Sequence, residues 1–365
     1  MPGLYIHIPF CASACPYCDF AFVVGRDRQS SRYVDALIAE FETRASASTH
    51  PFDTVYFGGG TPTSLAASDL ARILETVETK GRLSDTAEIT VEANPNDREK
   101  FESLQQLGIT RLSLGIQSSD DATLAALGRT HSGQDSADAV RTAREAGFDN
   151  VSLDAIFGAP GQSVSEWEHD LNTLMDLNPD HVSLYGLTIE PQTPFGKQHA
   201  SDRLIVPDDD EQSRMYDVAL ECTDRAGYEQ YEISNFARPG YESAHNLACW
   251  RGDTYLGIGM GAHSYDGSSR SWNTRSLNTY LDRVQASGSA EEEHERLPKE
   301  ARDIEHIMLG LRTRDGIEST LIAEGATTTR LLKEQLIEQS GTRLRLTRRG
   351  KPIADLVCAE LVKDL

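Results

Sequence analysis

Three cysteines near the beginning of the chain form the residue pattern with the clearest chemical meaning. Cys11, Cys15 and Cys18 stand in the pattern C-x3-C-x2-C within the run HIPFCASACPYCDF. Three thiolates from one short loop can hold three irons of a cubane cluster, which leaves the fourth iron without a protein ligand. An open iron is a chemical site, whereas a fully ligated cluster only carries electrons. The spacing therefore predicts a [4Fe-4S] cluster with one open coordination site.

Two other interpretations of these cysteines stay open at this point. Structural zinc usually takes four ligands from two separated pairs, which this spacing does not offer. His7 could still complete a Cys3His zinc site, and the three thiols could also be buried and unreactive. Tyr17 and Phe20 lie in the same loop, where aromatic rings would shield a cluster from water.

The composition indicates a soluble globular protein from a reducing compartment. The chain has 365 residues, 39% of them hydrophobic, and contains no long apolar run. Its first residues have neither the basic region nor the cleavage site of a secretory signal. Three further cysteines, Cys222, Cys249 and Cys358, are scattered, which argues against a disulfide framework. We therefore expect a cytoplasmic protein.

The charge of the chain disfavours some classes of partner. Thirty-five basic against 57 acidic residues give a net charge of −22 at pH 7. An acidic surface repels phosphate backbones, so we expect no nucleic-acid partner. The sequence has no amphipathic basic helix, so we expect at most peripheral membrane contact. It predicts no particular oligomeric state.

Short apolar runs alternate with amphipathic stretches from residue 4 to about residue 236. The expected strands are 4–8, 54–57, 88–93, 111–116, 150–157 and 181–187. The expected helices are 31–44, 67–79, 97–107, 132–147, 164–177 and 209–226. Strands separated by helices of this length pair in parallel through right-handed crossovers. We therefore predict an α/β fold, a partial (β/α)6 TIM-like barrel, with a ligand-facing edge at the carboxyl ends of its strands.

Two further regions follow this expected barrel of residues 1–236. Residues 237–290 are rich in Gly, His and Trp, and we expect them to pack on the barrel. We expect residues 291–365 to form a mostly helical domain, with helices at 300–312, 317–324, 327–339 and 350–363 and a strand at 343–347. Three helices with a small ribbon resemble a winged-helix module. The net acidity favours protein packing over DNA binding for such a module.

A glycine-rich motif, GGGTPT at 58–63, directly follows the second expected strand. The cysteine pattern after a first strand, with this loop after the second, resembles the radical S-adenosylmethionine (SAM) superfamily. In that superfamily SAM chelates the open iron through its amino and carboxylate groups, and one electron from the cluster yields a 5′-deoxyadenosyl radical. The resemblance therefore implies a radical SAM barrel with a [4Fe-4S] cluster and SAM as cofactors.

The same resemblance implies SAM-binding roles for polar residues at consecutive strand ends. Glu92, in VEANP, resembles the carboxylate that holds the SAM amino group. Arg129, in LGRTH, resembles the arginine that pairs with the SAM carboxylate, for which its forked side chain is suited. Gln117 and Asp154 resemble the ligands of the ribose hydroxyls. The positions lining the methionine part of SAM and the cluster are matched by Tyr5, Tyr17, Gly59, Gly60 and Thr61.

Within the superfamily, the segments YIHIPFC, VEANP and GIGMGAHSY and the helical tail resemble the coproporphyrinogen oxidase-like group. That group contains the oxygen-independent coproporphyrinogen III oxidase and a haem chaperone. The oxidase has a further cysteine two residues beyond the third, where this chain has Phe20. It also has an N-terminal extension, whereas this chain reaches its first expected strand at Leu4. Both features favour the haem chaperone.

A third feature is HNLACW at 245–250, which resembles an H-N-x-x-Y-W signature linked to haem binding in the chaperones. His245 could serve as an axial imidazole, and Trp250 could stack on a porphyrin face. Cys249 stands where the signature has Tyr, and it could pack as a small apolar residue or offer a thiolate to iron. The alternative is a buried histidine beside a core tryptophan. His263 is a lesser candidate that could line the adenine side of SAM.

The resemblance as a whole implies a haem chaperone that binds haem, a [4Fe-4S] cluster and SAM and passes haem to acceptor haemoproteins. An electron donor such as a flavodoxin or ferredoxin would be a second partner. We expect coproporphyrinogen oxidase activity to be absent. The first alternative is that activity itself, a radical oxidative decarboxylation in porphyrin biosynthesis. The second is a DNA-binding regulator that uses the winged-helix-like tail, with the cluster as redox sensor.

Overall fold

One large sheet organises the molecule. The computed structural model describes residues 2–45, 50–80, 83–322 and 325–364. Within them the order across the sheet is β14 (Glu291–Arg296), β13 (Ser269–Asn273), β12 (His263–Tyr265), β11 (Tyr255–Ile258), β1 (Gly3–Ile8), β4 (Phe52–Gly59), β5 (Leu83–Ala93), β6 (Arg111–Gln117), β7 (Val151–Phe157), β8 (His181–Gly186), β10 (Asn235–Ala237) and β9 (Glu229–Gln230). Neighbours from β11 to β8 are parallel. The strands beyond them at both ends are antiparallel.

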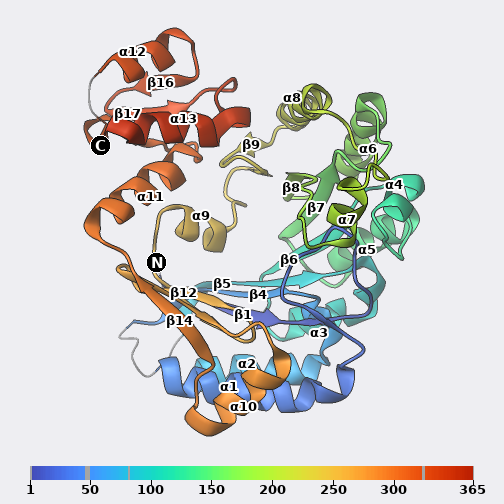
Figure 1. The fold of residues 1–365 in the computed structure, drawn as a ribbon. Helices are drawn as coiled ribbons and strands as arrows, with labels where there is room; N and C mark the ends of the chain where they lie inside the picture. Colours follow the sequence, from blue (N-terminus) through green and yellow to red (C-terminus); the bar gives the residue numbers. More distant parts are fainter. Residues whose placement is uncertain (1, 46–49, 81–82, 323–324, 365) are drawn as a thin grey trace.

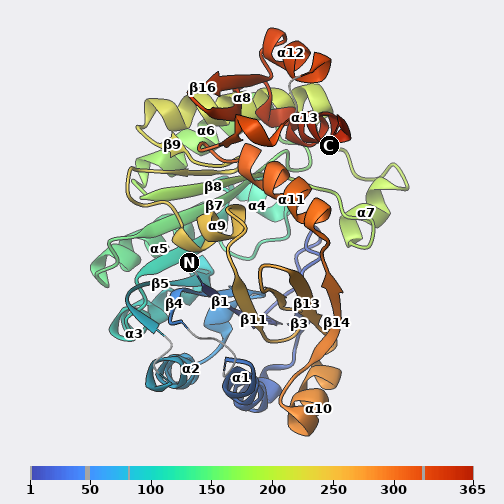
Figure 2. The same cartoon turned by 90° about the vertical axis from the view of Figure 1, so that its left-hand side faces the viewer.

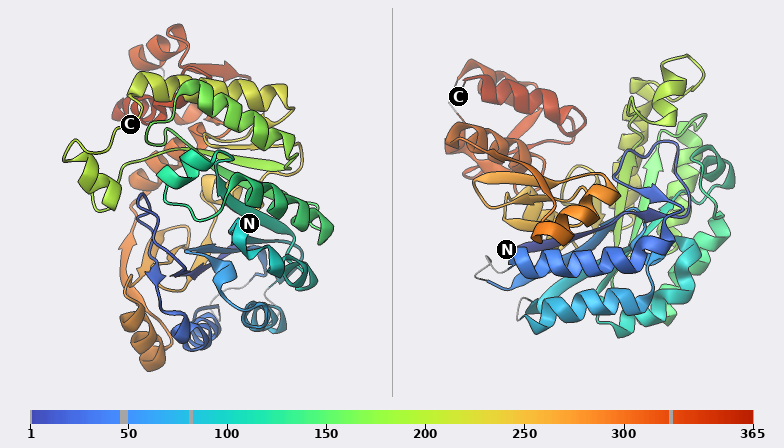
Figure 3. Two further views of the ribbon diagram at one scale, coloured as in Figure 1. Left: turned by 90° about the vertical axis from the view of Figure 1, so that its right-hand side faces the viewer. Right: turned by 60° about the horizontal axis from the view of Figure 1, so that its bottom comes forward.

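Amphipathic helices cover the outer side of the parallel strands (Figures 1 and 3). They are α1 (Ser30–Arg44), α2 (Ala67–Thr79), α3 (Phe101–Gln106), α5 (Gly133–Glu145), α6 (Val164–Asp176) and α8 (Asp209–Arg225). The helix α2 shows why such segments fold this way, because its buried residues Leu70, Ile73, Leu74 and Val77 recur at helical spacing. The helices α5 and α6 each begin with a capping box, at Ser132 and Ser163.

The predicted α/β class and partial barrel are confirmed. The six expected strands correspond to β1 and β4 to β8, and β14 and β9 lie at the two ends of the strand order. The expected helix at 97–107 is divided into a 3-10 segment, η4 (Pro95–Lys100), and α3, and Asp97 within η4 has non-helical backbone angles. A short helix that we did not expect, α4 (Asp121–Ala126), follows β6.

The C-terminal part has a hydrophobic core of its own. Its elements are α11 (Lys299–Leu311), β15 (Ile317–Glu318), α12 (Ala326–Lys333), β16 (Ile337–Ser340), β17 (Arg343–Leu346) and α13 (Ala354–Leu361). The three strands form a small antiparallel sheet in the order β15-β17-β16. Figure 2 shows this unit above the large sheet, with α11 leading up to it. The predicted winged-helix-like α+β character is confirmed.

Two predicted helices in this part are wrong, the first in type and the second in extent. The expected helix at 317–324 is the strand β15 followed by a 3-10 turn at Ser319–Leu321, and residues 323–324 lie outside the described residues. Ile317 pairs with Leu344, so a partner distant in sequence decides its conformation. The expected helix at 327–339 ends at Lys333 because Gln335 adopts a φ of 58° and the chain then enters β16.

Residues 237–296 extend the large sheet beyond β1 with the strands β11 to β14, and they also form two helices. The helix α9 (Ala244–Trp250) precedes β11, and α10 (Leu277–Ser287) lies between β13 and β14. The acidic stretch at 291–295 is part of β14, which pairs with β13 and therefore extends the large sheet. The division into parts at 1–236, 237–290 and 291–365 remains a proposal.

Candidate functional site

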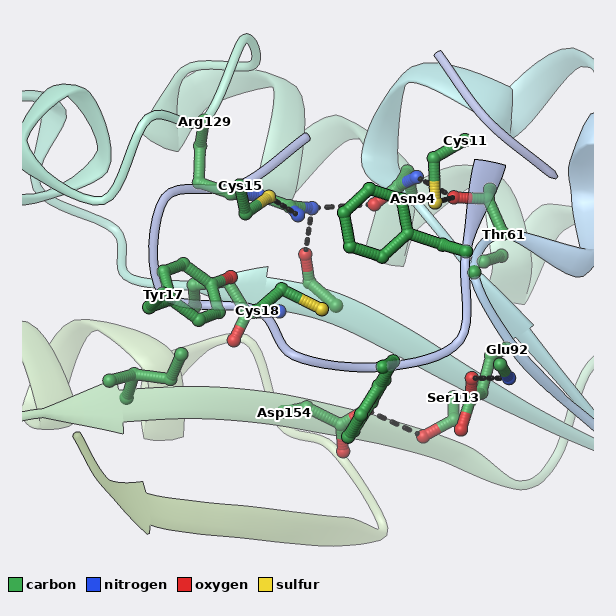
Figure 4. A pocket seen from close by; sticks show the side chains of 18 of the residues that line it. Cys11, Cys15, Tyr17, Cys18, Thr61, Glu92, Asn94, Ser113, Arg129 and Asp154 are labelled. Atoms are coloured by element: carbon green, nitrogen blue, oxygen red, sulfur yellow. Dashed lines mark hydrogen bonds between the residues drawn. The ribbon is translucent and has the colours of Figure 1, made fainter. Parts of the chain in front are cut away.

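A cavity of about 640 Å³ lies at the carboxyl ends of the parallel strands and continues along their inner faces (Figure 4). Ligand pockets in proteins are roughly 300–1,000 Å³ in volume, so the cavity can hold a cofactor-sized molecule. Most of the residues predicted to bind the cluster and SAM line it: Cys11, Cys15, Tyr17, Cys18, Gly59, Gly60, Thr61, Glu92, Gln117, Arg129 and Asp154. Tyr5 is absent from the described lining, because it packs behind this wall against Tyr56.

The three cysteines lie on the loop between β1 and α1. The short strands β2 (Phe10–Cys11) and β3 (Val23–Val24) pair in parallel and close the base of this loop. Backbone hydrogen bonds tie it to the glycine-rich loop, since Gly60 N donates to Ile8 O (2.8 Å) and Thr61 N donates to Phe10 O (2.9 Å). Burial raises the pKa of Cys11 to about 11, so binding a metal would displace a proton from this thiol.

A chain of polar contacts connects two of these cysteines. The Thr61 hydroxyl donates to Cys11 Sγ (3.8 Å), and Asn94 Nδ2 donates to Thr61 Oγ1 (3.1 Å). From the other side, Arg129 Nη2 donates to Asn94 Oδ1 (2.5 Å), and Arg129 Nη1 donates to Cys15 Sγ (3.4 Å). Figure 4 shows these side chains together around the cysteine loop. The arrangement places hydrogen-bond donors against the sulfur atoms, which stabilises negative charge on them.

Two glycines let the second loop approach the cysteines. Gly59 has a φ of 116°, and a Cβ there would lie 2.6 Å from the His7 ring. A Cβ on Gly60 would lie 2.8 Å from both Cys11 Sγ and Pro9 O. Side chains at these positions would displace the loop that carries Cys11.

Glu92 lies at the end of β5 and is held by two donors. Tyr56 Oη donates to Oε1 (2.9 Å) and Gly59 N donates to Oε2 (3.1 Å). Burial raises the pKa of Glu92 to about 7, and the charge of Asp154 adds to the rise. A cationic group beside this carboxyl would restore its ionised form.

Gln117 and Asp154 lie on the neighbouring strands. Asp154 accepts a hydrogen bond from Ser113 Oγ (3.0 Å), and burial raises the pKa of Asp154. Gln117 has a φ of 67°, a left-handed conformation that costs a non-glycine residue about 1 kcal/mol or more. Such strain is common where a side chain is held toward a ligand.

His7 is unsuited to a zinc site with the three cysteines. Its Nε2 lies 2.6 Å from Ala21 O, and its Nδ1 lies 3.1 Å from Tyr5 Oη. Both ring nitrogens therefore already have protein partners. Burial lowers the pKa of His7 to about 4, so the ring is neutral at pH 7.

The residues present fit a cluster with SAM. Three thiols from one loop form the donor set expected of an iron–sulfur cluster with an open iron. Arg129 Nε is buried and has no hydrogen-bond partner among the described residues, so this guanidinium has a donor left for an anionic ligand. Glu92, on β5, supplies a carboxyl that could bind the amino group of SAM.

The helix α9, which carries the HNLACW motif, lies at the opposite end of the strands, where β1 begins (Figure 1). His245 is buried, its Nδ1 lies 2.8 Å from Thr54 Oγ1, and its ring contacts that of Tyr56. It is not part of the described cavity lining, but its neighbour Asn246 is. Cys249 and Trp250 are half-buried and also lie outside the described lining.

Two further residues differ from what we expected of them. Phe20 lines the cavity, but 63% of it is exposed, so it gives the cluster loop less cover than predicted. His263 lies on β12, where its ring stacks on Trp272 at 5.7 Å, and it is absent from the described lining. The prediction that His263 lines the SAM site therefore has no support in the geometry.

Comparisons with known proteins identify the family of this chain. The radical SAM superfamily model matches residues 5–174. The heme chaperone HemW of Bacillus subtilis is 35% identical, with 100% of both chains covered. The heme chaperone HemW of Mycobacterium tuberculosis is 36% identical over 99% of this chain and 94% of its own. This chain belongs to the HemW family of the radical SAM superfamily.

The fold of this HemW family member is also that of a solved radical SAM enzyme. Coproporphyrinogen III oxidase (HemN) from Escherichia coli superposes with a TM-score of 0.86 and covers 100% of this chain and 91% of its own. The two sequences are 23% identical, so this likeness establishes the fold alone. Among the described residues, no helix is long and apolar enough to cross a membrane.

Several lining residues escaped prediction from the sequence. Asn94 bonds both Thr61 and Arg129, and the VEANP segment that we singled out for Glu92 also contains it. Arg111, Ser113, Ser183 and Tyr185 line the inner part of the cavity. They alternate with apolar residues along β6 and β8, a pattern that the sequence shows once these strands are known to have one face toward a cavity.

Proposed function

We propose that this chain is a haem chaperone that binds haem, a [4Fe-4S] cluster and SAM and passes haem to acceptor haemoproteins in the cytoplasm. The observation that carries this proposal is its similarity, over the full chain, to relatives named heme chaperone HemW. The six cysteines are free thiols in the structure, which agrees with a reducing compartment.

Cys11, Cys15 and Cys18 would hold the cluster, and the donors Thr61 and Arg129 would bond its sulfur ligands. When bound, the cluster and SAM supply one-electron reductive chemistry. The chain's part is to hold SAM. Glu92 would bind the amino group, Arg129 the carboxylate, and Gln117 and Asp154 the ribose hydroxyls. Tyr17, Gly59, Gly60 and Thr61 would line the site, and Tyr5 would support it through Tyr56.

His245 would ligate the haem iron. Its Nδ1 is bonded to Thr54, and no hydrogen bond from a described residue reaches Nε2, the nitrogen that would face iron. Cys249 is four residues further on the same helix and could contribute a second ligand or only packing. Trp250 would stack on the porphyrin. Since His245 is buried, haem binding would require α9 to shift.

The partners follow from this proposal. Acceptor haemoproteins would receive haem, and a flavodoxin or ferredoxin would reduce the cluster. The net charge of −22 disfavours a nucleic-acid partner, and the lack of an amphipathic basic helix in the sequence leaves at most peripheral membrane contact. The oligomeric state stays unpredicted.

Anaerobic reconstitution tests the cluster and SAM. We expect about four irons per chain and an EPR signal of the reduced protein that changes when SAM is added. Cys11→Ala should abolish the signal, whereas Cys222→Ala, which removes a buried thiol outside the cavity lining, should keep it. A colourless, zinc-loaded protein after reconstitution would refute this part of the proposal.

Haem titration tests the chaperone function and the ligand. His245→Ala should weaken haem binding about tenfold or more and shift the Soret band, because the axial imidazole is lost. His263→Ala removes a histidine outside the described cavity lining and should change neither. An unchanged spectrum in the His245 variant would remove it as a ligand, and Cys249→Ser would show whether the thiolate serves instead.

The cavity supports a second candidate function, the oxidative decarboxylation of coproporphyrinogen III. The residues matched to SAM line it as a catalytic radical SAM protein would require. Phe20, in place of the additional cysteine of that oxidase, argues against this activity. Accumulation of protoporphyrinogen in an anaerobic assay with SAM and a reductant would favour the oxidase over the chaperone.

A further inference from the structure

An arginine lies inside the cavity without a bonded partner. Arg111, the first residue of β6, is 2% exposed and lines the cavity. Its Nε has no hydrogen-bond partner, and among the described residues no carboxylate forms an ion pair with its guanidinium. A buried charge without a bonded partner is costly, so arginines in such positions usually have one. Arg111 is therefore a buried cation of this site that has no bonded anion among the described residues.

The carboxyl groups of the cavity do not supply that partner. Asp154 already accepts a hydrogen bond from Ser113, and Glu92 accepts hydrogen bonds from Tyr56 and Gly59. The charge of Arg111 lowers the pKa of both carboxyls, but burial raises each pKa more strongly. Arg111 is thus close enough to act on them through space and is hydrogen-bonded to neither.

Arg111 lies away from Arg129, the residue proposed to bind the SAM carboxylate. Arg129 donates to the backbone oxygen of Gly115, four residues beyond Arg111 on the same strand. Four residues of strand span about 13 Å, so the backbone of Arg111 lies well away from the Arg129 guanidinium. Arg111 instead lies toward the end of the cavity where α9 contributes Asn246, and its charge also lowers the pKa of the neighbouring His245.

We propose that Arg111 is a carboxylate-binding subsite on the floor of the cavity and that it holds a propionate group of haem. The second half of this statement rests on the proposed haem-chaperone function. The planar guanidinium presents paired donors that match a carboxylate, and it keeps its charge under all physiological conditions. Tyr185 lines the same cavity, and its hydroxyl provides a further donor for this group.

The test compares haem with haem dimethyl ester, in which both propionates are neutral. Both ligands are titrated into the reconstituted protein by absorbance, with wild type, Arg111→Gln, Arg111→Lys and the control Arg72→Gln, which removes a surface charge on α2. Arg111→Gln should weaken haem binding about 30-fold or more, because it removes one partner of a buried charge pair. Arg111→Lys should recover part of the affinity. Wild type should bind the ester as weakly as Arg111→Gln binds haem. The affinity for the ester should be the same in wild type and in the Arg111 variants.

The outcomes separate this inference from the function on which it rests. If wild type binds haem and its ester equally well, or if Arg111→Gln binds haem as wild type does, the subsite is refuted and the chaperone proposal stands. If wild type binds neither ligand, both are refuted. SAM binding to Arg111→Lys, which keeps the charge that lowers the pKa of Glu92, should equal that of wild type when it is measured by the change in the cluster EPR signal. A loss of SAM binding in both Arg111 variants would show that Arg111 supports the fold of the cavity, and it would refute the proposal that Arg111 is a propionate subsite.

Discussion

Binding and stability make opposite demands on the carboxyl group of Glu92. The side chain is buried, and burial with the charge of Asp154 raises the pKa of Glu92 from 4.5 to about 7. The folded protein therefore favours the protonated form, whereas an amino group of SAM needs the ionised form. The proton is bound more tightly in the folded state than in the unfolded state. This contribution to stability is thus complete below pH 4.5 and is lost as the pH rises through 7.

Glu92→Gln should remove this loss, because the amide stays neutral at every pH. We expect the gain in free energy of unfolding over wild type to be about 2 kcal/mol larger at pH 8 than at pH 5. The same variant should bind SAM about tenfold or more weakly at pH 8, because the proposed carboxylate partner of the amino group is gone. Urea unfolding at both pH values and calorimetric SAM titration measure the two effects.

The exposed Glu102 on α3 provides a matched control. Glu102→Gln removes the same charge and should shift stability equally at both pH values. Unfolding free energies of wild type and Glu92→Gln that run parallel from pH 5 to pH 8 would contradict the raised pKa.

The sequence predicted the residues of the site that belong to contiguous motifs. Cys11, Cys15 and Cys18 required only their spacing, and Glu92 and Arg129 required only a family pattern; the structure brings all five to one cavity. The role of Arg111 could not be predicted in this way. An arginine before an apolar strand is typical of a strand that starts at the surface, and only the three-dimensional arrangement shows that this one is buried.

At the scale of elements, local pattern succeeded where helices and strands alternate. The helices around the barrel bury one face each, so hydrophobic spacing determined their positions to within a few residues. Local pattern failed at β14, whose six residues are all exposed in the pattern EEEHER. That segment is a strand because it pairs with β13, and a pairing partner distant in sequence is invisible to local analysis.

The helix α9 shows the same division between local and distant causes. Ser243 caps it by accepting from Asn246 N, a signal that the sequence contains. The further support comes from Glu88 at the middle of β5, whose carboxylate accepts from Ala244 N (3.0 Å) and His245 N (3.2 Å). A helix of seven residues is marginal alone, so this contact with the sheet determines where the haem motif lies.

At the scale of the whole molecule, polar contacts hold the C-terminal part against the segment that leads into α9. Arg314 donates to Glu242 (2.6 Å) and to Glu229 (3.1 Å), and its backbone N donates to Tyr231 O (2.9 Å). Ile233 adds an apolar contact with the C-terminal core. Because ion pairs form much of this contact, it should weaken as salt screens them, with a Debye length of about 3 Å at 1 M.

Arg314→Ala should therefore loosen residues 229–250 more than the barrel. Losing two ion pairs, one of them with the mostly buried Glu242, should cost about 1 kcal/mol, which corresponds to roughly fivefold faster hydrogen exchange in that segment. Hydrogen–deuterium exchange with mass spectrometry measures this, and wild type in 1 M NaCl should approach the variant. Arg330→Ala is the control, because Arg330 pairs with Glu334 and Glu360 within the C-terminal part.

The same variant tests whether the C-terminal part influences the haem motif. Only one residue lies between Glu242 and α9. When the ion pair at Glu242 is lost, the contact between His245 and Thr54 should therefore weaken as well. Because the proposed haem binding at His245 requires α9 to shift, Arg314→Ala should speed haem association while the control leaves it unchanged. Faster exchange at 229–250 with an unchanged association rate would show that docking of the C-terminal part does not govern access to the haem ligand.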